Sequence, residues 1–113
     1  MSTNNTGTSF VSTTRLIFVS TPHSSAILAV HRKVFDILVN HGLKEGVDYD
    51  FNIESYVGYN GSERRLFIYL TESATRDLGD YYAKFMPVVR NCAAPLFVES
   101  SLNTYTPSPY AVL

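Results

Sequence analysis

Hydrophobic and polar residues alternate with two different periods along the chain, and the change of period separates strands from helices. From Val47 to Glu54, apolar residues alternate one by one with acidic or amide residues. This period of two predicts a strand with one face in the core and the other outside it. Short apolar, β-rich runs at 14–20, 65–71 and 95–99 predict three further strands.

A period close to 3.6 follows the first predicted strand. The apolar residues on this stripe are Ile27, Val30, Val34, Ile37 and Leu38. Ser24 or Ser25 is expected to cap the start of this helix, because a serine hydroxyl can accept a hydrogen bond from a free N–H of the first turn. The helix is expected to end at Asn40-His41-Gly42, where Gly42 tolerates the left-handed conformation that terminates many helices.

A second helix is predicted from about Ser73 through Phe85. Pro87 is expected to kink or end it, because an interior proline removes a backbone hydrogen bond at a cost of about 3 kcal/mol. Residues 58–62 are a predicted turn between the second and third strands.

The predicted element order is therefore β-α-β-β-α-β, in the α+β class. Two β-α-β units that share one antiparallel sheet make a ferredoxin-like sandwich, with both helices on one face. We expect one domain over residues 14–113 with an extended C-terminal tail, preceded by a flexible tail over residues 1–13.

The composition of the 113 residues is that of a globular protein: 45% are hydrophobic, 17% are charged, and the formal net charge is −1. This balance gives no general attraction to nucleic acid or to an anionic membrane surface. The one cysteine, Cys92, cannot form a disulfide within the chain, and no signal peptide or membrane span is visible. A cytoplasmic protein is expected, with neither nucleic acid nor membrane as a partner.

Aromatic residues on the predicted strands require an explanation. If Ile17, Val19, Leu66, Ile68, Leu70, Leu96 and Val98 face the helices, the residues Phe18, Phe67, Tyr69 and Phe97 face away. Such a face suits stacking on single-stranded RNA or packing against copies of the same chain. The neighbouring strand carries Asp48, Asp50 and Glu54, which would repel phosphates, so packing between copies is favoured.

The candidate chemistry gathers near the second turn. The three histidines lack the close spacing and companion cysteines of a zinc site, and no phosphate-binding glycine loop is present, so neither a metal nor a cofactor is expected. Around the turn lie Tyr56, Gly58, Tyr59 and Glu63, and Ser20 ends the first strand. Loops beside strand ends often carry functional residues. By itself, however, a glutamate after a turn is usually a solvated surface residue.

Read from end to end, residues 14–110 resemble the small phage-encoded S-adenosylmethionine lyases, formerly called S-adenosylmethionine hydrolases. The points of similarity are Val19-Ser20, His31-Arg32, Gly58-Tyr59, Glu63, Val98 with Ser101, and Thr104-Tyr105-Thr106 leading to Tyr110. The resemblance implies a PII-like homotrimer in which ferredoxin-like subunits pack sheet-inward and bind the substrate between them.

The family cleaves S-adenosylmethionine to methylthioadenosine and homoserine lactone, and so depletes the methyl donor of the infected host cell and counters restriction. The resemblance implies that Glu63 and Tyr59 are the catalytic residues. It implies substrate-binding roles for Ser20, Tyr56, Gly58 and Tyr105. Neither a metal nor a cofactor is implied.

Two other functions fit the same sequence. A non-catalytic PII-like module that binds a nucleotide would share the fold and the trimer. A phage protein that inhibits another protein through its aromatic sheet face would share only the fold.

Overall fold

The computed structural model describes residues 10–21, 25–58, 61–92 and 94–105, and for residues 58 and 101–105 it describes the backbone only. The elements follow in the order β1 (Phe10–Ser20), α1 (Ala26–Asn40), β2 (Tyr49–Gly58), β3 (Gly61–Leu70), α2 (Glu72–Leu78), α3 (Tyr81–Cys92) and β4 (Leu96–Tyr105). The predicted α+β order is therefore present, with the second helix divided into two.

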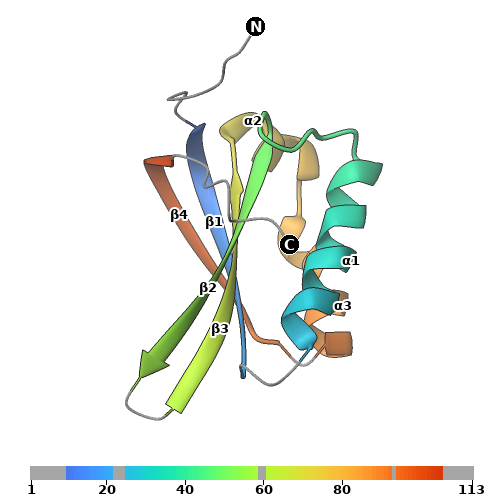
Figure 1. Ribbon diagram of the computed structural model, residues 1–113. Coiled ribbons are helices and arrows are strands. Elements are labelled where there is room, and N and C mark those ends of the chain that lie inside the picture. Colours follow the sequence, from blue (N-terminus) through green and yellow to red (C-terminus); the bar gives the residue numbers. More distant parts are fainter. Residues whose placement is uncertain (1–9, 22–24, 59–60, 93, 106–113) are drawn as a thin grey trace, which may run out of the picture.

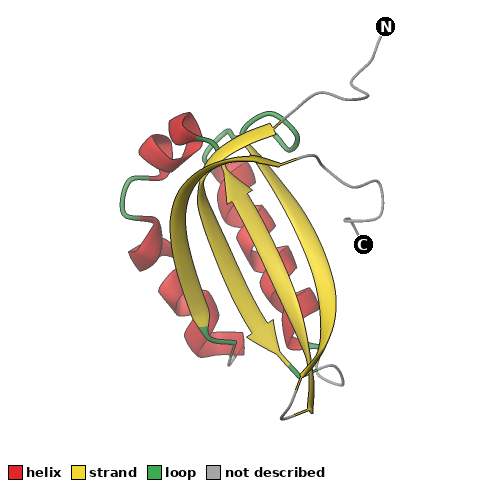
Figure 2. Cartoon of the chain, turned by 90° about the vertical axis from the view of Figure 1, so that its left-hand side faces the viewer, coloured by secondary structure: helices red, strands yellow, loops and turns green. Residues whose placement is uncertain are grey.

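The four strands form one antiparallel sheet with the order β2-β3-β1-β4. The helices lie together on one side of this sheet, as Figure 1 shows from the edge and Figure 2 shows with the sheet in front of them. This is the ferredoxin-like sandwich that the sequence predicts. We call the sheet surface opposite the helices the open face.

The main core lies between the sheet and the helices. The apolar stripe of α1 contributes Ile27, Val30, Val34 and Leu38, all fully buried. From β2, Tyr49 and Phe51 enter the same core, because every second residue of a strand points to the same side. Val47, which we expected to begin this strand, lies before it and is exposed.

The structure corrects the faces assigned to β1. Ile17 lies opposite Phe67, and Phe18 lies opposite Leu66. Directly opposed residues in a sheet point to the same side. Phe18 is therefore a fully buried residue of the main core, and Ile17 packs with Phe67 on the open face.

Less aromatic surface is exposed on the open face than the sequence suggested. Phe67 and Tyr69 are only 5% and 8% exposed, and they form a second small cluster with Phe10, Ile17 and Tyr56. Phe97, which lies opposite Ile17, is 53% exposed.

The interruption of the second helix falls at Gly79 rather than at Pro87. Gly79 ends α2 with a φ of 66°, a left-handed angle that favours glycine. Asp80 then accepts a hydrogen bond from the N–H of Ala83 (3.1 Å), which satisfies a free donor in the first turn of α3. Pro87 lies inside α3, which continues to Cys92.

The first, third and fourth strands are longer than the apolar runs that predicted them. β1 begins at Phe10, inside the segment expected to be a flexible tail, and β3 begins at Gly61 rather than at Arg65. β4 continues to Tyr105. Pairing with a neighbouring strand extends each of them beyond its apolar residues.

Candidate functional site

One end of the sheet carries a hollow of about 390 Å³ that gathers residues from four elements and the segments between them. Its lining residues are Val19, Ser20, Thr21, Ala26, Ser62, Glu63, Cys92 and Pro95. They come from the end of β1, the start of α1, the start of β3, the end of α3 and the residue before β4. We call this hollow the strand-end pocket. Its volume lies within the range of about 300–1,000 Å³ that is typical of small-molecule sites.

The β2–β3 hairpin places two further candidate residues beside this pocket. Tyr56 lies directly opposite Glu63, and Gly58 lies opposite Gly61 in the last pair of the ladder. Four of the predicted site residues, Ser20, Tyr56, Gly58 and Glu63, are therefore at the same end of the sheet.

Glu63 is held by an arginine two residues further along β3. The guanidinium of Arg65 donates from Nε and Nη2 to Oε2 of Glu63. The same guanidinium lies 4.2 Å from the ring centroid of Tyr56, a cation–π geometry. This arrangement fixes the cation between the carboxylate and the aromatic ring.

Tyr56 is itself anchored on β2. Its hydroxyl donates to Oε1 of Glu54 (2.6 Å), and Asn52 donates from Nδ2 to Oε2 of the same carboxylate (2.6 Å). The hydrogen bond to Glu54 raises the pKa of the Tyr56 hydroxyl. A continuous chain of polar contacts therefore runs from β2 to Glu63.

A second arginine occupies a similar environment at the other end of the open face. Arg15 pairs with Glu99 across β1 and β4 and lies 5.6 Å from the ring centroid of Phe67. On its other side, Arg15 lies opposite Tyr69 of β3, which in turn lies opposite Asp50 of β2. Asp50 is 5% exposed, and its Oδ2 has no hydrogen-bond partner in the described part of the chain.

Burial raises the pKa of Asp50. Among the described residues of the open face, carboxylates outnumber guanidinium groups. The carboxylates belong to Asp50, Glu54, Glu63 and Glu99, and the guanidinium groups belong to Arg15 and Arg65. An acidic surface of this kind does not suit phosphate binding.

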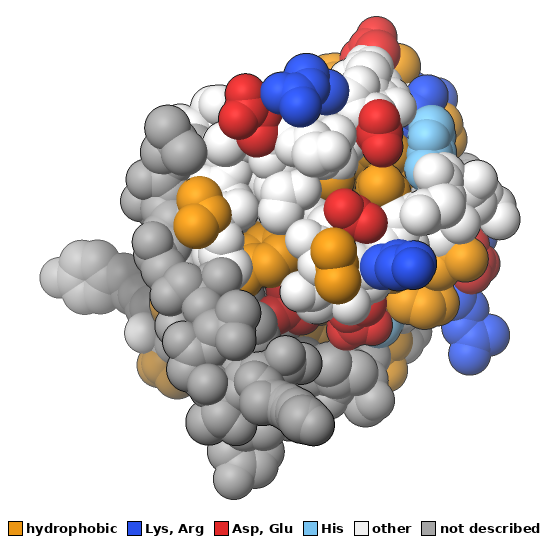
Figure 3. Space-filling view, turned by 90° about the horizontal axis from the view of Figure 1, so that it is seen from above, with side chains coloured by type: hydrophobic (Ala, Val, Ile, Leu, Met, Phe, Trp, Pro, Cys, Tyr) orange, Lys and Arg blue, Asp and Glu red, His pale blue; other side chains and the backbone are white. Residues whose placement is uncertain are grey.

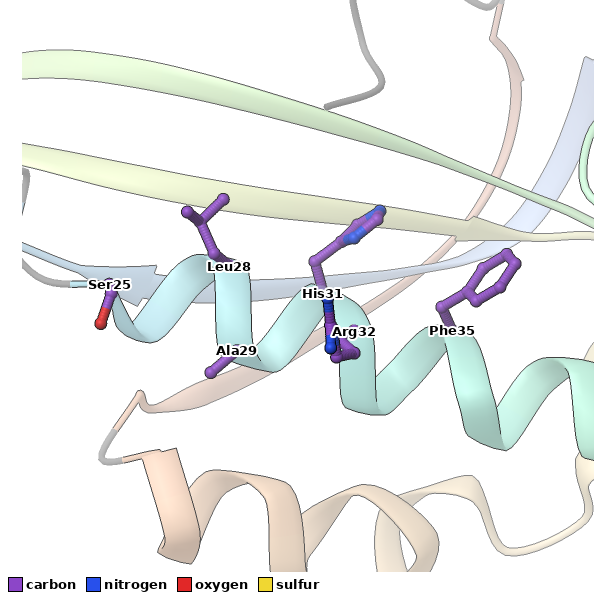
Figure 4. Close-up of a pocket in the computed structure, with 6 residues that line it drawn as sticks. All are labelled: Ser25, Leu28, Ala29, His31, Arg32 and Phe35. Carbon is purple, nitrogen blue, oxygen red and sulfur yellow. The ribbon is translucent and has the colours of Figure 1, made fainter.

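A larger hollow, of about 760 Å³, lies along α1 (Figure 4). Leu28, His31 and Phe35 extend from the helix toward the strands, and the imidazole of His31 lies edge-on to Phe51 of β2 at 4.5 Å between ring centroids. Burial lowers the pKa of His31 and favours its neutral form. Because a single helix lines this hollow, while the strand-end pocket combines several elements and the candidate residues, we assign the site to the latter.

The structure does not bring the remaining two predicted site residues, Tyr59 and Tyr105, into the description of this cluster, for different reasons. Tyr59 lies outside the described residues. The backbone of Tyr105 pairs with Phe10, at the opposite end of β1 from Ser20. At about 3.3 Å per residue, β1 separates these two ends by roughly 30 Å. Within one chain, Tyr105 does not reach the strand-end pocket.

Sequence reasoning missed Arg65 and Cys92 as neighbours of the site. Arg65 could have been found, because residues two apart on a strand share a face and Glu63 was already a candidate. Cys92 reaches the pocket only through the path of α3, for which the sequence offers no local signal.

Within the described residues, no group of three or more histidine, cysteine or acidic side chains is arranged to bind a metal ion. None of the helices described is both long and apolar enough to cross a membrane. Seen from above, acidic and basic side chains are interspersed among hydrophobic ones (Figure 3).

We found no match to this chain among protein-family models, curated proteins or solved structures. The strand-end pocket and its residues are therefore the basis for a functional proposal.

Proposed function

We propose that this protein is an S-adenosylmethionine lyase that releases methylthioadenosine and homoserine lactone. The observation that carries this proposal is the convergence of Ser20 and Glu63, from different strands, on one hollow of about 390 Å³. These are two of the residues to which the family resemblance gives a role. In an infected cell, the reaction would deplete the methyl donor used by restriction systems.

The chemistry requires little beyond orientation. The substrate carboxylate, already ionised at neutral pH, attacks its own γ-carbon. A C–O bond forms as the C–S bond breaks, and the electron pair leaves with sulfur as a neutral thioether. No proton is transferred, so no general base is needed. The task of the protein is to fold the methionine chain so that the reacting atoms meet.

Glu63 suits the task of holding the substrate ammonium. Arg65 contacts Oε2 of Glu63, and in this proposal Oε1 receives the ammonium. A carboxylate placed on the sulfonium would be counterproductive, because that positive charge disappears in the transition state and the ground state would be stabilised more. Ser20 also lines the pocket, from the helix side of the sheet, and in this proposal it binds a further polar group of the substrate.

The proposal includes a homotrimer. The helices cover one face of the sheet, and on the opposite face Phe97 is about half exposed beside Ile17 and Phe67. Packing of three such faces would bury this apolar row, and substrate would bind between subunits.

Product identification tests the function. Purified protein incubated with S-adenosylmethionine and a chelator is expected to release methylthioadenosine together with homoserine lactone. Activity that is lost with the chelator and restored by zinc or magnesium would contradict the mechanism. Homoserine appearing before any lactone would indicate attack by water instead, with Glu63 as a general base. Nucleotide binding without product would favour a non-catalytic module.

A further inference from the structure

Glu63 lines the strand-end pocket, and Arg65, which carries the opposite charge, pairs with it on the open face. Their side chains are 35% and 36% exposed, so a ligand can reach both. Arg65 lies opposite Val19, which lines the pocket, and shares the face of β3 on which Glu63 lies. An α-amino acid carries an ammonium and a carboxylate at a similar spacing, with charges complementary to this pair.

We propose that Glu63 and Arg65 together bind the amino-acid end of the substrate, with Glu63 accepting from the α-ammonium and Arg65 donating to the α-carboxylate. The identity of the ligand as S-adenosylmethionine rests on the proposed function. In the free protein the two side chains neutralise each other, and on binding each exchanges part of that contact for a substrate group.

The surroundings of the Arg65 guanidinium hold it in place for binding a carboxylate. It lies over the ring of Tyr56, whose hydroxyl is held by Glu54. The planar fork of an arginine can donate two parallel hydrogen bonds to a carboxylate, which orients it as well as binding it. The start of α1 at the same pocket adds the positive end of a helix dipole, with no acidic residue in its first turn.

The two side chains should affect different kinetic constants. The carboxylate loses its negative charge as the C–O bond forms, so Arg65 stabilises the bound substrate more than the transition state. Arg65 therefore lowers KM without raising kcat. Glu63 holds an ammonium whose charge does not change in the reaction, and its orienting effect should appear in kcat.

Calorimetric titration with two probes tests the binding role. Sinefungin carries the amino-acid zwitterion but has no sulfonium to cleave, and methylthioadenosine lacks the amino-acid end. Arg65→Gln is expected to weaken sinefungin binding about 10- to 100-fold, the effect of losing a charge-assisted contact, and to leave methylthioadenosine binding unchanged.

Arg15→Gln is the matched control, because Arg15 also pairs with a glutamate and lies over an aromatic ring on the same face. It is expected to bind both probes as the wild type does, with light scattering confirming equal assembly of all proteins. Equal weakening of both probes by Arg65→Gln, or normal binding of sinefungin, would overturn the proposal.

Kinetics with S-adenosylmethionine give a second readout. Arg65→Gln is expected to raise KM with kcat unchanged or higher, and a fall in kcat at unchanged KM would overturn the assignment. If the wild type releases no methylthioadenosine but its sinefungin binding depends on Arg65, the result would support the Glu63–Arg65 binding site and refute the lyase activity.

Discussion

At the scale of single residues, two carboxylates on the open face differ in what surrounds them. Glu63 pairs with a guanidinium and lines a pocket, which suits a group that meets a ligand. Asp50 accepts one hydrogen bond, from the N–H of Phe51 (2.9 Å), and its other oxygen is buried without a partner in the described residues. Asp50 therefore destabilises the fold when it is ionised.

Asp50→Asn is expected to raise the free energy of unfolding by about 1 kcal/mol at pH 7, because it removes a poorly compensated buried charge and keeps the acceptor for Phe51. The raised pKa of Asp50 sets the pH dependence: the folded chain binds a proton more readily than the unfolded chain. As pH falls through the raised pKa of Asp50, the wild type gains stability and the advantage of the variant shrinks.

Urea unfolding at pH 7 and near pH 4 measures this difference. Glu99→Gln is the control, since that carboxylate is partly exposed and paired with Arg15. An advantage of Asp50→Asn that grows on acidification would show that Asp50 is stabilised in its charged form.

At the scale of elements, the sequence predicts the order and type of each segment because period and turn residues are local properties. The prediction that the apolar stripe of α1 lies in the main core was confirmed, and so was the inward direction of Tyr49 and Phe51 on β2. The assignment of Phe18 to the open face was wrong, because the inward side of β1 is decided by its register against β3. The predicted break at Pro87 was wrong: Pro87 lies inside α3, and the helix is interrupted at Gly79, which adopts a left-handed φ.

The candidate site was predictable only in part. Ser20 and Glu63 are far apart in sequence, and their shared pocket follows from antiparallel pairing of the strands that carry them. The turn residues were indicated by their place beside strand ends and by the family resemblance, and the contacts of Glu63 identify Arg65. The placement of Tyr105 at the far end of the sheet depends on strand length, which the apolar run underestimated.

At the scale of the whole molecule, the described helices cover one side of the sheet, and we propose that the open face makes the contacts between subunits. Phe97→Asp is expected to convert a trimer to monomers, because an unpaired charge in a desolvated interface is strongly unfavourable. Phe97 is half exposed in the single chain, so the fold should survive. Light scattering at micromolar concentration measures the assembly.

Tyr82→Asp is the control for that substitution, because Tyr82 is exposed to a similar extent (52%) but lies on α3. It is expected to leave the trimer intact. A wild-type protein that is monomeric at micromolar concentration would remove the subunit interface, and with it the proposed location of the substrate.

The most direct test of the account compares methylthioadenosine release by the wild type, Glu63→Gln and Glu99→Gln. Glu63→Gln keeps the size of the side chain but loses the charge that would hold the ammonium, so turnover is expected to fall by at least about tenfold, the effect of losing a contact to a charged group. Glu99→Gln, which alters the other ion pair of the open face, is expected to retain wild-type turnover. Absence of release by the wild type, or near-normal release by Glu63→Gln, would contradict the lyase and the site assigned to it.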